Sequence, residues 1–387
     1  MTIRKIIFWA HLVAGVVAGL VIGIMCLTGA ALAFEKELTA WSERDARQID
    51  PPPAGTARIP LEELQARVRA AYPAARPTTI VVQNDPSAAV AFTAGRTVGF
   101  YVNPYTGEVR QPRSNATAVL MQSLIDWHRY LSLSGEVSRP RGKLINGICN
   151  VAFCVLAVTG LYLWMPRSWS WRSVRGIALF NWKFKGQARD FNWHNVVGLW
   201  TAPLLIVLTV TAMPISFRWA ANAIFTLTGT EPPGAAPMAP IAIPGQPGVP
   251  LFSREALLAI AQKELPEWTT LTLRLDSAEA ASGKVQAVTF TARLANSWPR
   301  TATTTLSLNP FSGEVLRRSG YAEQNAALQV RAWTRFLHTG EALGWAGQIF
   351  AGIACAGGCV LVWTGLALAW RRFWGRKLDA PVPATPK

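Results

Sequence analysis

Four long stretches without a charged residue constrain this chain more than any other feature. They cover residues 6–34, 144–166, 191–217 and 342–370. Each exceeds the roughly 20 helical residues that cross a hydrocarbon layer about 30 Å thick. Because 50% of the 387 residues are also hydrophobic, the pattern predicts an integral membrane protein, mainly α-helical, with a core of four transmembrane helices.

Basic residues between the spans indicate the orientation of the chain. The 166–190 connection carries six lysines and arginines against a single acid, Asp190, and basic residues also flank the first and last spans. By the positive-inside bias, this connection and both termini are expected on the cytoplasmic side of the membrane. Residues 35–143 and 218–341 then lie outside. Since these outer segments carry nearly balanced charge, the net charge of +16 reflects topology and indicates no nucleic-acid partner.

The two halves of the chain match piece by piece, which indicates a parallel internal repeat. The repeated unit is a helix, an outer domain, a pre-membrane helix with one histidine, and a second helix. In such a repeat the pseudo-two-fold axis follows the membrane normal, so corresponding residues lie at equal depth. The matching pairs are HLVAGVVAGLVIGIMCLTGA (11–30) with HNVVGLWTAPLLIVLTVTAM (194–213), YVNPYTGEVR (101–110) with SLNPFSGEVL (307–316), LIDWHRYL (124–131) with WTRFLHTG (333–340), and AVTGLYLW (157–164) with VWTGLALAW (362–370).

Each outer segment is predicted to be a small α+β unit. PLEELQARVRAAYP (60–73) and SREALLAIAQKELP (253–266) have the period of amphipathic helices. Each is followed by three runs that favour strands and by an Asn-Pro turn. The Pro- and Gly-rich stretch 229–250 is expected to hold neither helix nor strand.

The predicted organisation follows from these patterns. It consists of transmembrane helix 1 at 1–34, outer domain 1 at 35–118, a pre-membrane helix and transmembrane helix 2 at 119–165, a cytoplasmic loop at 166–190, transmembrane helix 3 at 191–217, a linker and outer domain 2 at 218–322, a pre-membrane helix and transmembrane helix 4 at 323–372, and a cytoplasmic tail at 373–387.

The chain has only four histidines, and all lie near the ends of the predicted spans. His11 and His194 lie at the cytoplasmic ends of the first and third spans, and His128 and His338 precede the second and fourth spans on the outer side. The repeat pairs His11 with His194 and His128 with His338. If a pair of imidazoles binds one metal ion such as iron, their two ligating nitrogens lie about 4 Å apart across the metal. This distance excludes a pair made of one cytoplasmic-side and one outer-side histidine. Ionisable residues at membrane depth usually serve function.

Two opposed imidazoles without an acidic or thiolate ligand suit the axial positions of a haem iron, whereas a zinc site needs three or four protein ligands. Because no Cys-x-x-Cys-His motif occurs, two b-type haems with bis-histidine ligation are expected. Two other interpretations of the histidines stay open. They are interfacial packing and a proton relay, and the relay is disfavoured because no Asp or Glu is expected inside the helices.

Arg129, Arg141 and Arg335 lie close in sequence to the second histidine pair. They are candidates for charge-assisted hydrogen bonds with haem propionates. An ordinary positive fringe at the membrane surface explains them equally well.

These motifs resemble the PepSY-associated transmembrane family, and the resemblance covers nearly the whole chain. The motifs are Trp-Ala-His in the first span with Leu-Thr-Gly near its end, Asn-Pro-x-Thr/Ser-Gly-Glu-Val in both outer segments, Trp-His-Arg-Tyr-Leu or Phe-Leu-His-Thr-Gly before the even spans, and Thr-Gly-Leu-x-Leu within them. The resemblance implies periplasmic PepSY-like domains and a four-helix core associated with haem. Inner-membrane ferric-siderophore reductases of Gram-negative bacteria are among the members, so the resemblance also implies a bacterial inner membrane. The SRPRG stretch (138–142) has no counterpart in the second half.

The expected function is therefore that of an oxidoreductase in iron uptake. A di-haem electron-transfer path would take electrons from a cytoplasmic donor or quinol and reduce a periplasmic ferric siderophore. No dinucleotide-binding or Walker signature occurs, so the donor is expected to be a separate molecule. Two alternatives remain: a haem-free membrane protein whose outer domains bind or regulate a periplasmic partner, and a di-haem reductase of another metal or of a partner cytochrome.

Overall fold

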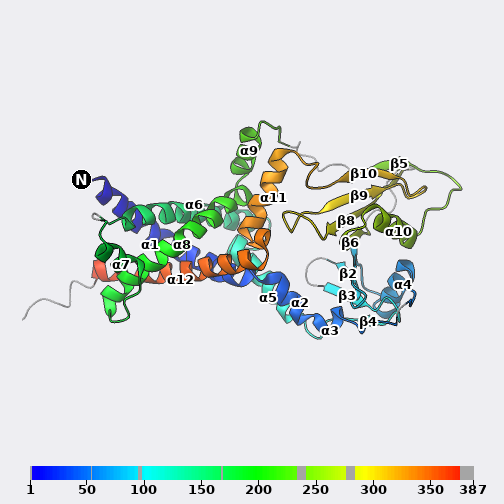
Figure 1. Ribbon diagram of the computed structural model, residues 1–387, viewed down its shortest axis with the longest axis horizontal. Helices are drawn as coiled ribbons and strands as arrows, with labels where there is room; N and C mark the ends of the chain where they lie inside the picture. Colours follow the sequence, from blue (N-terminus) through cyan, green and yellow to red (C-terminus); the bar gives the residue numbers. More distant parts are fainter. Residues whose placement is uncertain are drawn as a thin grey trace, which may run out of the picture. The chain divides into compact units, whose positions relative to one another are not determined.

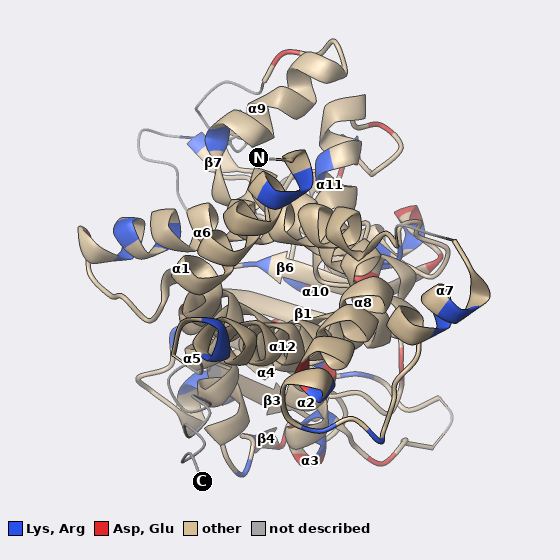
Figure 2. Cartoon of the chain, turned by 90° about the vertical axis from the view of Figure 1, so that its left-hand side faces the viewer, with Lys and Arg blue, Asp and Glu red and all other residues tan. Residues whose placement is uncertain are grey.

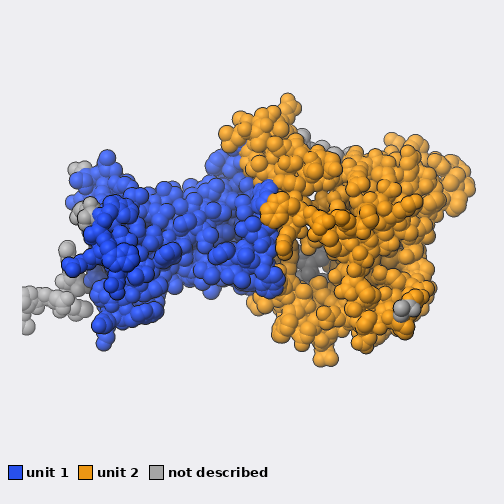
Figure 3. All heavy atoms as spheres, in the orientation of Figure 1, with its two compact units in different colours: residues 1–34, 123–223, 333–387 blue, residues 35–122, 224–332 orange. Residues whose placement is uncertain are grey.

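A computed structural model describes residues 2–53, 55–94, 98–166, 169–232, 241–275 and 284–374. The chain forms two compact units (Figure 3). Unit 1 contains residues 1–34, 123–223 and 333–387, and unit 2 contains residues 35–122 and 224–332. Each unit is therefore assembled from both halves of the sequence.

Four long helices lie side by side in unit 1 (Figure 1). They are α1 (Ile3–Leu32), α6 (Ser138–Trp164), α8 (Gly186–Ser216) and α12 (Trp345–Trp374), and all four are long and apolar enough to cross a membrane. A helix satisfies its own backbone polar groups, as lipid requires. The four predicted spans are thus confirmed. α1 and α8 each pack against both α6 and α12, which places α1 diagonally opposite α8.

Small residues let these helices approach closely. A Cβ atom on Gly357 of α12 would lie 2.5 Å from the Cγ2 atom of Thr201 on α8. On the same helix, Gly358 stands against the Cys26 thiol of α1, again without room for a Cβ atom. Because lipid tails are as apolar as the side chains of a bundle core, close packing of this kind is what holds membrane helices together.

The 166–190 connection contains more regular structure than its basic composition indicates. It includes α7 (Trp171–Ala178), whose arginines are seen in Figure 2, and the first turn of α8, which begins at Gly186. The carbonyl groups at the end of α7 accept hydrogen bonds from side chains of α8. Trp200 donates to Ala178 (3.0 Å), and the buried Asn192 amide donates to Gly176 and Leu179 (both 3.2 Å). The connection is therefore fixed to α8.

The chain also contains shorter helices. Two of them carry the remaining histidines: α5 (Ala116–Tyr130) and α11 (Ala326–His338). Both occupy the positions predicted for the pre-membrane helices. The others are α2 (Glu35–Ser42), α3 (Arg44–Arg47), α9 (Arg218–Leu227) and the 3-10 turn η1 (Glu341–Leu343).

The strands of both outer segments form one eight-stranded antiparallel sheet in unit 2, in the order β10-β9-β8-β6-β1-β2-β3-β4. The sequence predicts two separate units, whereas the structure joins their strands where β1 pairs with β6, with Val81 opposite Thr272. An unpaired strand edge favours such pairing because its backbone groups need partners. The strands are β1 (Thr79–Gln83), β2 (Val90–Ala94), β3 (Val98–Val102), β4 (Val109–Arg110), β6 (Trp268–Arg274), β8 (Val288–Leu294), β9 (Thr304–Leu308) and β10 (Val315–Ser319).

The two predicted amphipathic helices, α4 (Leu61–Ala71) and α10 (Arg254–Glu264), share one hydrophobic core with the sheet strands. They cap each other's first turns. The Glu255 carboxylate accepts a hydrogen bond from the backbone N–H of Leu61 (3.1 Å), and Glu62 accepts one from the N–H of Arg254. Free N–H groups at helix starts need acceptors, so these contacts fasten the two segments together.

The two Asn-Pro motifs form the same tight turn. Gly107 donates its N–H to the carbonyl of Asn103, and Gly313 donates to Asn309, both at 2.8 Å. The φ angles of the two glycines are 75° and 72°, a region that a residue with a Cβ atom rarely adopts. The shared turn explains why this motif is repeated in the sequence.

The prediction for 229–250 is wrong at one place. β5 (Ala242–Pro244) lies within this stretch and pairs with β7 (Lys284–Gln286) in a separate two-stranded sheet. Proline is tolerated there because β5 is an edge strand. Residues 233–240 of the same stretch, and the predicted tail from residue 375 onwards, lie outside the described residues.

Candidate functional site

His11 of α1 and His194 of α8 face each other inside unit 1. Their ring centroids are 6.5 Å apart, and their planes are nearly perpendicular, at 85°. The two helices do not need to touch for this contact, since each packs on α6 and α12. The structure thus brings together the two residues that the sequence pairs.

His128, in the last turn of α5, faces His338, the last residue of α11. The ring centroids are 6.2 Å apart, and the planes make an angle of 45°. Burial lowers the pKa of His128 to about 4, with a further contribution from His338, and burial also lowers the pKa of His338. Both imidazoles are therefore neutral near physiological pH, which is the form that binds metals.

The two pairs lie at different levels of the same bundle. His11 belongs to α1, and Nδ1 of His128 lies 2.9 Å from Oγ1 of Thr28 on that helix. From residue 11 to residue 28, a rise of 1.5 Å per residue gives about 25 Å. This separation is close to the thickness of a hydrocarbon core, which is about 30 Å.

A threonine hydroxyl fixes the tautomer of each imidazole in the first pair. Nδ1 of His11 lies 2.9 Å from Oγ1 of Thr159, and Nδ1 of His194 lies 2.9 Å from Oγ1 of Thr364. Each hydroxyl donates its own hydrogen to the carbonyl four residues earlier in its helix, at 2.6 and 2.7 Å. A hydroxyl has a single hydrogen, so it must accept one from the imidazole. Nδ1 is then protonated, and the Nε2 lone pair is free.

The second pair reaches the same tautomer through different acceptors. Thr28 accepts from Nδ1 of His128, because its hydroxyl donates to the carbonyl of Ile24 (2.6 Å). Nδ1 of His338 instead donates directly to the backbone carbonyl of Leu208 (2.9 Å). All four imidazoles therefore keep Nε2 available as a ligand.

Three of the four rings lie against a glycine of another helix. A side chain at any of these glycines would be in tight contact with the ring. The missing Cβ atom therefore lets the imidazole occupy its observed position. A Cβ atom would lie 3.2 to 3.4 Å from the Cε1 atom of the ring at Gly160 against His11, Gly365 against His194 and Gly29 against His128.

Each pair is suited to hold one metal ion between its two rings. With metal–nitrogen bonds of about 2 Å and ring centroids about 1 Å behind the nitrogens, the centroids should be about 6 Å apart. The observed separations of 6.5 and 6.2 Å fit this arrangement. Within the described ranges, no group of three or more His, Cys, Asp or Glu is arranged to hold a metal ion. A metal held by two imidazoles would take its other ligands from a cofactor.

The three candidate arginines are exposed at the surface. The guanidinium of Arg129 lies over the ring of Tyr130, at 5.2 Å from its centroid, and that of Arg335 lies 5.8 Å from the centroid of Phe336. Arg141 lies in the first turn of α6. Their charges are accessible to an anionic group, while the aromatic contacts restrict two of the three side chains.

Asp190 corrects one expectation drawn from the sequence. It lies inside α8 and is only 1% exposed, although no acidic residue was expected within a helix. Its carboxylate forms ion pairs with Arg189 (2.9 Å) and with Arg371 of α12 (2.8 Å). A buried charge needs such partners, so Asp190 connects two helices at the His194 end of the bundle.

Sequence reasoning did not assign roles to Thr28, Thr159 and Thr364, which accept the imidazole hydrogen bonds. A signal for them was present. Each threonine occurs in one of the stretches that match between the two halves, at a fixed distance from a glycine. The acceptor of His338 left no such signal, because it is a backbone carbonyl.

These features define an integral membrane protein whose helix bundle contains two facing pairs of histidines. The sequence matches the family model described as the PepSY-associated TM region over residues 8–372. The chain therefore belongs to this family, as the motifs predict. No curated protein matches the chain.

Proposed function

We propose that the protein is a di-haem electron-transfer protein that carries electrons across the bacterial inner membrane to a periplasmic ferric siderophore. The observation that carries this proposal is the geometry of the two histidine pairs. Each presents two imidazoles that donate hydrogen bonds through Nδ1 and so offer Nε2 as the ligating atom, and their ring separation fits one metal ion. The bound b-type haems would supply reversible one-electron chemistry at two depths of the membrane.

The remaining contributions come from the chain itself. The hydrogen bonds at Nδ1 hold each ring in one tautomer and one orientation, which raises the basicity of the ligating nitrogen. Arg129, Arg141 and Arg335 offer charge-assisted hydrogen bonds to propionates beside the His128–His338 pair. The buried, mostly aliphatic residues between the pairs exclude water from the interior of the bundle.

Equivalent contacts in the two halves support the internal repeat. The segments containing Thr159 and Thr364 match in sequence, and both hydroxyls accept from a histidine Nδ1. The diagonal placement of α1 and α8 fits a pseudo-two-fold axis along the bundle. The distribution of basic residues favours cytoplasmic termini, with the His11–His194 pair on the cytoplasmic side.

Reduction is a sufficient means of releasing iron. Siderophores bind Fe(III) through hard oxygen ligands, and these bind Fe(II) far less tightly. One electron delivered on the periplasmic side would release the metal without destroying the chelator. A ferric siderophore is thus the proposed substrate, and the enzyme class is a ferric-chelate reductase.

A redox difference spectrum of the purified full-length protein, expressed with ample haem, tests the cofactor. We expect b-type Soret and α bands and about two haems per chain. A protein that contains no haem under these conditions would contradict the proposal and favour a haem-free protein that binds or regulates a periplasmic partner.

Anaerobic mixing of the reduced protein with a ferric siderophore tests the acceptor. We expect the haem bands to return to the oxidised form. The gallium(III) complex of the same siderophore is a matched control, since gallium cannot accept the electron. Reoxidation by a copper salt or an oxidised cytochrome, but not by ferric chelates, would assign a different acceptor.

A further inference from the structure

Four aromatic side chains gather beside His194 and form what we call the aromatic platform: Phe180, Trp182, Trp193 and Trp363. Neighbouring rings are in contact, with centroids 5.5 Å apart for Phe180 and Trp182, 5.9 Å for Phe180 and Trp193, 6.1 Å for Trp182 and Trp193, and 6.4 Å for Trp193 and Trp363. Such edge-to-face and tilted contacts stabilise one another and fix the orientation of each ring.

The platform is held in place by a buried amide. Asn192 is 3% exposed, and its Oδ1 atom accepts a hydrogen bond from the backbone N–H of Asn181 (2.9 Å), between Phe180 and Trp182. The loop that carries these two rings is therefore rigid, and its aromatic groups are nevertheless open to the surroundings. Trp182 is 77% exposed, and Trp363 is 51% exposed.

The platform is connected to the His11–His194 pair at two points. Trp193 directly precedes His194, and Trp363 directly precedes Thr364, whose hydroxyl accepts the hydrogen bond from His194. The segments that match these in the first half have Ala10 and Val158 at the corresponding positions. The rings at these two positions are therefore particular to the second half of the chain.

We propose that the aromatic platform is the docking site for the head group of a membrane quinol, which donates electrons to the His11–His194 haem. This inference rests on the proposed function and names its electron donor. The flat, exposed rings suit a flat aromatic head group. The guanidinium of Arg189 lies 6.0 and 5.4 Å from the ring centroids of Trp193 and Trp363. Its Nε and Nη2 atoms donate to Asp190, so Nη1 is the atom that can donate a hydrogen bond to an oxygen of the ligand.

The depth of the platform favours a lipid-soluble donor over a soluble flavoprotein. Trp363 lies on α12 within a candidate membrane span. Because its ring is also 51% exposed, this edge of the platform opens toward the lipid layer, in which a quinol moves. The cation beside it, Arg189, marks the polar boundary at which the head group of a quinol lies.

The electron balance is simple. Oxidation of the quinol to the quinone breaks two O–H bonds and releases two electrons and two protons. A haem held by His11 and His194 would accept these electrons one at a time, so each quinol would supply two one-electron reductions of a ferric siderophore. The protons pass to water at the end of the bundle where the 166–190 connection lies.

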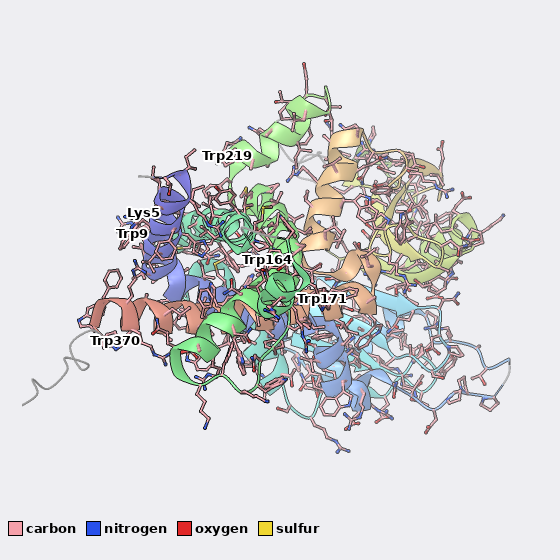
Figure 4. The ribbon with its side chains drawn as sticks, turned by 60° about the vertical axis from the view of Figure 1, so that its left-hand side comes forward. Lys5, Trp9, Trp164, Trp171, Trp219 and Trp370 are labelled. Atoms are coloured by element: carbon pink, nitrogen blue, oxygen red, sulfur yellow. The ribbon has the colours of Figure 1, made fainter. Side chains whose placement is uncertain are left out.

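Photolabelling of the full-length protein with an azidoquinone tests binding independently of electron transfer. We expect labelled peptides from residues 179–200 and from the part of α12 around Trp363, and a loss of labelling by about tenfold in Trp182→Leu. Trp171→Leu is the matched control, because Trp171 is also exposed (75%) and lies on the same connection (Figure 4). Equal labelling of both variants, or labelling elsewhere, would overturn the proposal.

Anaerobic stopped-flow reduction by a soluble quinol, duroquinol, tests electron donation. The rate of haem reduction should fall by about tenfold in Trp182→Leu and in Trp363→Leu, with dithionite reducing all variants fully. If dithionite reduces the haems but duroquinol does not, the platform proposal fails and the proposed function stands. If the protein holds no haem, the proposed function fails, and photolabelling still decides whether a quinone binds. Reduction by free reduced flavin, but not by duroquinol, would assign a flavin donor.

Discussion

The His11–His194 pair and the His128–His338 pair both consist of two facing imidazoles, but they differ in their hydrogen-bond acceptors and in their ring angles. In the first pair both imidazoles donate to threonine hydroxyls, whereas in the second pair one donates to Thr28 and the other to the backbone carbonyl of Leu208. The ring planes also differ, at 85° and 45°. The two pairs therefore contain the same residue type but differ in their hydrogen-bond acceptors and ring angles. Differences of this kind can change the properties of otherwise identical sites.

The largest expected effect comes from removing a ligand. His194→Ala should lower the haem content from about two to about one per chain, because an iron with a single imidazole is weakly held. His338→Ala should remove the other haem. Pyridine haemochrome analysis gives the ratio, and loss of both haems from either variant in a folded protein would contradict independent sites.

Removing a hydrogen-bond acceptor should have the next largest effect. Thr364→Val leaves Nδ1 of His194 without its partner, and haem affinity at this pair should fall by about 10-fold to 100-fold. Retention of haem during dilution or competition with apomyoglobin measures the change.

Thr201→Val is the matched control for that experiment. Thr201 is also buried and lies on the same helix as His194, but its hydroxyl donates to the carbonyl of Val197 (2.7 Å) and accepts from no imidazole in the described part of the chain. The control should retain haem as the unchanged protein does. A similar loss in both variants would mean that the hydroxyls act through helix packing.

The ring planes should distinguish the two haems without any substitution. Perpendicular imidazole planes leave two iron d orbitals nearly equal in energy, and planes at smaller angles separate them. The electron paramagnetic resonance spectrum of the oxidised protein should therefore contain two low-spin signals, with the larger principal g value from the His11–His194 pair. His194→Ala should remove that signal and leave the other. Identical signals would show that the planes do not differ.

The smallest expected effect concerns one glycine. In Gly29→Ala the new Cβ atom would lie 3.2 Å from Cε1 of His128 and 3.1 Å from Sγ of Cys355, so the ring must move by a few tenths of an ångström. We expect haem content to stay unchanged and the low-spin signal of the His128–His338 pair to shift slightly. The proposed repeat aligns Gly29 with Ala212, which is why we expect alanine to be tolerated. Loss of haem would indicate a tighter site than the structure shows.

Much of unit 1 could be predicted from the sequence because its signals are local. Charge-free length identifies a span by itself, and four rare histidines at matching places in two halves determine their pairing. The position of Asp190 could not be predicted. Its burial depends on Arg371, a residue on another helix that compensates its charge. The acceptor of His338 could not be predicted either. It is a backbone carbonyl, which every residue has, so no residue type in the sequence marks it.

Unit 2 was predicted element by element but not as a whole. Amphipathic periodicity identifies α4 and α10, and β-branched runs identify most strands. The pairing of β1 with β6 joins segments far apart in the chain, and no local pattern marks which strand edge meets which. The short strand β5 was missed because it pairs with β7 in spite of its proline.

The pairing of β1 with β6 also determines when unit 2 can be completed during synthesis. β1 ends at Gln83 and β6 begins at Trp268, so at roughly 5–20 residues per second β1 waits on the order of ten seconds for its partner. During this time its edge can recruit a strand from another chain. The ribosome makes α6 and α8 in that interval, so the sheet can be completed only after both long helices have been synthesised.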